Sequence, residues 1–363
     1  MTWFALRTRA ALGLAPTMVP VSLYVPLGFV LGPRVLNVLS YDVLAHLDGV
    51  VSVALATLGV FVGIALARQA RTSGRLIAAA SIESAMTIVV VTSAIVVLLL
   101  QWQVPISGEP GLIALVLGTA AAASSAGAAE AGVALSDRLA LTVADLDDLV
   151  PILVGAIALS LAADGARSGL GIALAQTAGI GIVIGLIGWL LFERASGPGD
   201  RAVYVLGTLA MLGGAAAYVK YSPMLTGLVA GAVWRLAPSR ADEIIGADLR
   251  KFHHPLLVLL LIDAGAQIGP YAEAIWLFAP FVVFRLTGKI VGGWAAARLA
   301  PELAADALGA YLFPPGVIGL AVALNFQQIE ATSGAVIVSA VAAGAVAFEL
   351  IATLAAQRPE RTA

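Results

Sequence analysis

Three aspartates, Asp145, Asp147 and Asp148, lie in a segment (residues 139–163) that is otherwise apolar enough to cross a bilayer. A charged aspartate near the membrane centre costs about 2.5–3.5 kcal/mol, and acids kept at that depth commonly mark an ion or proton pathway. Adjacent side chains on a helix point about 100° apart, so Asp147 and Asp148 can both border one cavity. Their oxygens suit a small monovalent cation such as Na+, with which a proton can compete. The other interpretation is that these acids cap a helix end, and we favour it for Asp145.

Two basic residues, Arg285 and Lys289, stand four positions apart in another apolar segment and therefore share one helical face. Lysine can lose its proton when it is desolvated, whereas arginine cannot. We therefore assign Lys289 the titrating role, paired with Asp147 when no cation is bound, and Arg285 a fixed structural charge. Alternatively, Lys289 could extend to the membrane surface.

Other polar residues of the apolar segments have less certain roles. We expect Glu83 and Glu349 to form structural ion pairs, for example between Glu83 and Arg285. Asp263 either lines a cavity or satisfies a helix break near Gly265. Two serines, Ser124 and Ser125, either offer oxygens to the ion or allow close helix packing.

The elements that position these residues are membrane helices. Of the 363 residues, 60% are hydrophobic and 12% are charged, and the mean hydropathy of +0.99 is typical of a polytopic membrane protein. Apolar windows predict about twelve spans. They cover approximately residues 10–31, 49–67, 74–101, 111–134, 139–163, 168–193, 202–219, 222–237, 255–268, 274–299, 303–326 and 332–357.

The basic residues predict the orientation of these spans. With both termini in the cytoplasm, most of the 20 Lys and Arg residues lie on the cytoplasmic side, and the outside loops hold Arg34, Arg167 and Lys220. Arg7 and Arg9 precede the first apolar run, which has no convincing cleavage site, so we expect a retained span rather than a signal peptide. These features predict a multi-pass membrane protein with both termini in the cytoplasm.

The composition excludes several functions. The chain has no cysteine, three histidines and a net charge of −2. Thiol catalysis, a His-rich metal site and a basic surface for nucleic acid are therefore excluded, and we expect no cofactor and no enzyme activity.

Two triplets of spans repeat one plan within a single transporter domain, residues 1–363. Core repeat 1 (74–163) has a softened helix at 123–127, and core repeat 2 (274–357) has one broken at 313–316. The first triplet starts inside and the second outside, so the repeats are inverted, and such paired interruptions point to a transporter's binding site. The remaining helices, about 10–67 and 168–268, form linking and dimerisation panels.

Four motifs in this order resemble the cation:proton antiporter superfamily, which includes bacterial Na+/H+ antiporters. They are Pro26 to Pro33, Leu146 to Leu149 with the paired aspartates of electrogenic members, Ser222 to Gly231, and Arg285 to Lys289. Two places depart from the family pattern. Ser124-Ser125-Ala126 replaces Thr-Ser/Asp-Pro, and Pro315-Gly316-Val317 stands where many members have Arg-Gly-Glu.

The resemblance implies an all-α fold of about twelve transmembrane helices, with two crossed broken helices in a six-helix core beside a dimerising panel. It implies a homodimer that exchanges Na+, or Li+, for protons by alternating access and serves pH homeostasis. Asp148 would be the principal cation and proton site and Asp147 the partner of Lys289, unless the family's basic residue aligns with Arg285.

Three other functions compete with this one. K+/H+ exchange uses the same oxygen ligands. Na+-coupled uptake of an organic anion occurs on a related fold but does not need a titrating lysine. Intramembrane aspartyl proteolysis needs a Gly-x-Gly-Asp pattern, which the sequence lacks.

Overall fold

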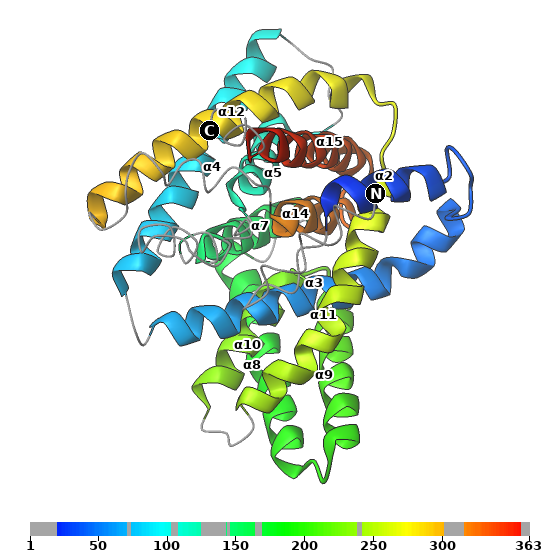
Figure 1. Ribbon diagram of the computed structural model, residues 1–363, viewed down its shortest axis with the longest axis vertical. Coiled ribbons are helices and arrows are strands. Elements are labelled where there is room, and N and C mark those ends of the chain that lie inside the picture. The colour runs from blue at the N-terminus through cyan, green and yellow to red at the C-terminus, as the bar shows by residue number, and fades with distance from the viewer. Residues whose placement is uncertain are drawn as a thin grey trace, which may run out of the picture.

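The computed structural model describes residues 20–70, 74–102, 108–124, 143, 146–163, 169–237, 242–300 and 316–356. These residues form twelve helices and no strand (Figure 1). The expected positions Ser125 and Asp145, and most of the break at 313–316, lie outside the described residues. The helices are α2 (Val21–Leu31), α3 (Tyr41–Ala70), α4 (Gly74–Trp102), α5 (Pro110–Ala122), α7 (Leu149–Ala162), α8 (Leu170–Arg194), α9 (Pro198–Tyr218), α10 (Pro223–Leu236), α11 (Asp242–Ala266), α12 (Ala272–Leu299), α14 (Val317–Gln327) and α15 (Ala331–Ala356).

Six helices are long and apolar enough to cross a membrane, namely α3, α4, α8, α9, α12 and α15. Each described helix falls in one predicted segment, although α3 and α11 begin earlier than the apolar windows do. The chain is thus a multi-pass membrane protein.

Several described helices are too short to span the bilayer alone, and two of them, α5 and α14, meet in the middle of the structure. Helix α5 has 13 residues and α14 has 11, which gives them lengths of about 20 and 16 Å against about 30 Å of hydrocarbon. Proline disfavours helical geometry in the residue before it and lacks an N–H, so Pro314-Pro315 explains why α14 begins only at Val317. The two short helices pack against each other near the centre of Figure 1.

The paired aspartates were expected inside a regular helix, but the structure places them in a turn. Helix α7 begins at Leu149, and Asp147 and Asp148 form the turn before it. The Asp147 N–H donates to the Val143 carbonyl at 2.9 Å, so the turn keeps a helical hydrogen bond. Both acids therefore lie at the positive N-terminal end of α7, which favours negative charge.

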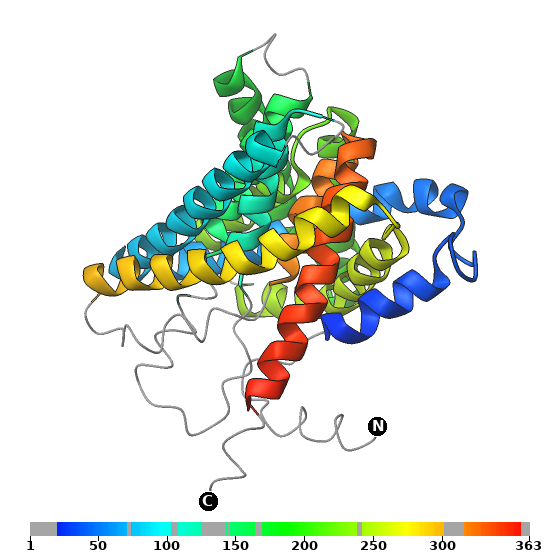
Figure 2. The same cartoon turned by 90° about the horizontal axis from the view of Figure 1, so that it is seen from above.

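The helices form two groups. Helices α4, α5, α7, α12, α14 and α15 lie together in the upper part of Figure 1, and α3, α8, α9, α10 and α11 lie below them. Helix α2 contacts α11 in one group and α15 in the other. Figure 2, from above, shows α4 and α12 running beside each other for much of their length.

Candidate functional site

Four charged side chains are completely enclosed between α4, α12, the end of α5 and the turn before α7. Glu83, Asp147 and Lys289 are 0% exposed, and Arg285 is 1% exposed. A charge removed from water is tolerated only when it is paired and hydrogen-bonded. We call these four residues the buried charge cluster.

Lys289 is the centre of the cluster. Its Nζ lies 3.0 Å from Asp147 Oδ2 and 3.0 Å from Glu83 Oε1, and it donates to Glu83 Oε2 at 3.2 Å. Lys289 therefore binds a carboxylate on α4 and a carboxylate in the turn before α7 at the same time. The sequence suggested Arg285 as the partner of Glu83, but in the structure Lys289 forms this ion pair. Lys289 lies on the side of α12 that faces α4.

The two basic residues also satisfy the end of the broken helix α5. The last carbonyls of a helix have no partner within the helix. Arg285 donates to the carbonyl of Ala121 and Lys289 to that of Ala122, while the Gly316 N–H lies 3.4 Å from the Ala123 carbonyl. Because Arg285 and Lys289 are four residues apart, they lie one turn apart on α12 and reach consecutive carbonyls at the end of α5.

Hydroxyl groups on α4 hold the carboxylates in place. Thr87 donates to Glu83 Oε1 at 3.2 Å, and Ser84 donates to the Asp147 carbonyl at 2.6 Å. The sequence analysis missed both residues. Small hydroxyl residues within one helical turn of an intramembrane acid are the signal that could have identified them.

Asp148 and Ser124 border the cluster. Asp148, next to Asp147, is half-buried and is the N-cap residue of α7. Ser124 is 2% exposed and lies close to the Asp147 carboxylate. The candidate oxygen ligands for a small cation are therefore the carboxylates of Asp147 and Asp148 and the hydroxyl of Ser124.

The remaining predicted residues have partners elsewhere. Glu349 Oε2 accepts a hydrogen bond from the Ser22 N–H at 2.7 Å, so this acid caps the start of α2. Asp263 is 3% exposed and accepts a hydrogen bond of 2.8 Å from Gln267 on the same helix. The ion pair expected for Glu349 stays a prediction, and the structure adds this hydrogen bond from the α2 backbone.

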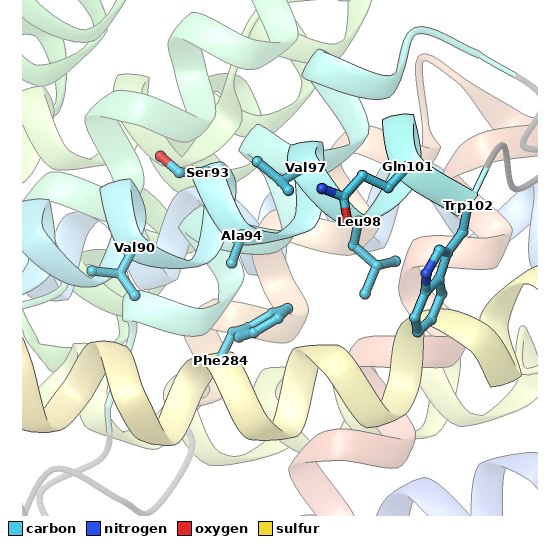
Figure 3. A pocket seen from close by; sticks show the side chains of 8 residues that line it. All are labelled: Val90, Ser93, Ala94, Val97, Leu98, Gln101, Trp102 and Phe284. Atoms are coloured by element: carbon cyan, nitrogen blue, oxygen red, sulfur yellow. The ribbon is translucent and has the colours of Figure 1, made fainter.

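One cavity lies apart from the charged side chains. It is a groove of about 520 Å³ between α4 and α12 (Figure 3). Aliphatic side chains such as Val97 and the ring of Phe284 line most of it, with Ser93 and Gln101 as polar groups. A void of about 10 Å³ beside Arg285 has room for at most about one water molecule. The buried charge cluster is therefore closed in this conformation.

Similarity to known proteins is found in the structure and not in the sequence. No protein-family model and no curated protein matches the sequence. The structure is similar to that of the sodium proton antiporter MjNhaP1 from Methanocaldococcus jannaschii at pH 8, with a TM-score of 0.65, 17% sequence identity and coverage of 92% of each chain. With its six long apolar helices and its two half-length helices that meet at Ala123 and Gly316, the chain has the fold of a sodium/proton antiporter.

Proposed function

We propose that this protein exchanges a monovalent cation, Na+ in the first place, for protons across a membrane. The observation that carries the proposal is a half-buried carboxylate, Asp148, at a helix start directly beside the fully buried Asp147–Lys289 ion pair. The protein of similar fold is named a sodium proton antiporter. The adjacent carboxylates also match the paired-aspartate signature of electrogenic antiporters.

The charges of the cluster favour a monovalent ion. Lys289 and Arg285 carry two positive charges, and Glu83 and Asp147 carry two negative charges, so the fully buried set is neutral. Net charge is costly where the dielectric constant is low. One Na+ or one proton at Asp148 changes the charge beside this set by a single unit, whereas a divalent ion changes it by two.

Competition at Asp148 produces the exchange. A proton that neutralises Asp148 displaces the cation on one side of the membrane, and loss of that proton allows a cation to bind on the other. The helices that carry the cluster move against α3 and its neighbours, so that the site faces one side at a time. More than one proton per Na+ makes the cycle electrogenic, so the membrane potential drives it.

We propose a homodimer in a bacterial inner membrane, with both termini cytoplasmic, as the setting of this exchange. The chain has no cysteine, so single introduced cysteines labelled from either side of the membrane test the orientation. Sedimentation in detergent tests the dimer.

The test of function is cation-driven proton movement in proteoliposomes that contain a pH-sensitive dye. We expect Na+ or Li+ to drive proton movement in the unmodified protein, and Asp148→Asn to reduce the initial rate at least about 100-fold, because amides do not bind and release protons in this pH range. Asp42→Asn, at an exposed position in the first turn of α3, is the matched control. Full activity of Asp148→Asn would refute the assignment, and a response to K+ alone would establish the K+/H+ alternative.

A further inference from the structure

Glu83 gives Lys289 a second carboxylate. The ammonium already forms an ion pair with Asp147 at 3.0 Å, yet Glu83 lies at the same distance and is fully buried. The charge of Glu83 balances that of Arg285 within the buried charge cluster, and its oxygens contact Lys289. Lys289 is therefore held by two acids that come from separate elements.

The contacts of Glu83 show what the second acid can do. Both of its oxygens lie within 3.2 Å of Lys289 Nζ, whereas Asp147 contributes only Oδ2. Thr87 on the same helix donates to Oε1 at 3.2 Å, so the carboxylate is held in position by its own helix. Glu83 can therefore keep the ammonium fully paired when Asp147 turns away.

We propose that Glu83 is a positioning residue that takes over Lys289 when Asp147 turns to the transported cation. This inference rests on the proposed exchange function. When a cation arrives, Asp147 exchanges Lys289 for the ion, and Lys289 stays bound to Glu83 and to the carbonyl of Ala122. No buried ammonium is left without a counterion at any stage.

This role differs from the titrating role that the sequence suggested for Lys289. In the role proposed here, Lys289 has a carboxylate partner at every stage and moves between two acceptors. The exchanged protons are carried by the carboxylates of Asp147 and Asp148.

Removing the charge of Glu83 should weaken cation binding more than turnover. In Glu83→Gln the fully buried set gains one net positive charge, and Lys289 has Asp147 as its only carboxylate in the cluster. A cation must then displace Lys289 without compensation. We expect the KM for Na+ to rise at least about tenfold, with a change in maximal rate of less than about threefold.

A double variant separates this role from simple support of the fold. Glu83→Gln with Lys289→Gln removes one charge of each sign, so the buried set is neutral again. We expect its KM for Na+ to lie at least about threefold below that of Glu83→Gln, because no ammonium then competes with the cation for Asp147. The carboxylate variant Glu83→Asp should lie between Glu83→Gln and the unmodified protein.

The measurement is the Na+ dependence of exchange in proteoliposomes of full-length protein, with Glu109→Gln as the control for loss of an exposed glutamate. An unchanged KM in Glu83→Gln overturns the inference while the function stands. A lower maximal rate with unchanged KM, in Glu83→Gln and in the double variant alike, shows a structural role and also overturns it. If Glu83→Gln does not fold, the KM of Glu83→Asp decides, and a value equal to that of the unmodified protein overturns the inference. Absence of exchange in the unmodified protein refutes the proposed function, and the inference with it.

Discussion

Two helix crossings of this molecule are packed closely but built differently. Where α3 crosses α10, glycines meet backbone: a Cβ on Gly59 would lie 2.0 Å from the Met224 carbonyl oxygen, and one on Gly227 would lie 1.9 Å from that of Ala56. Where α4 crosses α12, Glu83 meets Lys289. The pairs of neighbours also show that α3 and α10 run parallel, whereas α4 and α12 run antiparallel.

The difference separates two ways of holding helices together in a membrane. Lipid removes the hydrophobic drive between helices, so close backbone packing through small residues supplies the attraction at α3 and α10. The α4–α12 crossing adds charges whose burial costs free energy. A costly ion pair is best explained by function, and glycine packing by stability.

The largest effect is expected from a variant that disrupts the charged contact between α4 and α12. Lys289→Ala leaves Glu83 and Asp147 buried without their shared ammonium, which should lower the free energy of unfolding by about 3–5 kcal/mol. Thermal unfolding in detergent measures the loss, with Lys220→Ala, at an exposed position, as the control. A melting temperature equal to that of the control would contradict the role of the ion pairs in the fold.

The next largest effect is expected from a variant that disrupts the glycine contact between α3 and α10. Gly227→Ala forces a methyl group into the Ala56 carbonyl, and overpacking of this kind costs about 2–3 kcal/mol. Gly214→Ala on α9 adds a methyl group in open space, so it should be neutral or stabilising by up to about 1 kcal/mol. Equal thermal stability of the two variants would show that the close approach of α3 and α10 is not required.

The smallest effect compares one hydroxyl from each crossing. Thr87→Val removes the donor to Glu83 Oε1 and should cost about 1–1.5 kcal/mol, because a hydrogen bond to a buried charge is lost. Thr57→Val on α3 removes only a bond to the carbonyl of Val53 in its own helix, so we expect less than about 0.5 kcal/mol. If the two variants unfold at the same temperature, Thr87 does not support the carboxylate.

Much of the fold could be predicted because apolar length dictates it. Windows of hydrophobic residues located a segment for every described helix, and Pro314-Pro315 marked the interruption before α14. The start of α7 could not be read in the same way. The apolar window continues through the turn at Asp147, and the signal for the helix start was Pro151 in the first turn of α7.

The pairing within the site was only partly predictable. The spacing of Arg285 and Lys289 placed both on one face of α12, but it could not show which of them would meet Glu83. That choice depends on the rotation of α12 against α4, which is decided by tertiary packing such as that of Gly292 against the Glu83 backbone. The capture of the α5 carbonyls could not be predicted, because it depends on where that helix ends in space.

The hydrogen bonds at the broken end of α5 have a mechanical consequence. Arg285, Lys289 and the Gly316 N–H tie the end of α5 to α12 and to the start of α14, and Ser84 ties α4 to the turn before α7. These parts are therefore expected to move together as one rigid unit. In the exchange that we propose, the rate is then limited by collective motions of microseconds to milliseconds, so ions cross in separate cycles and a continuous channel current is not expected.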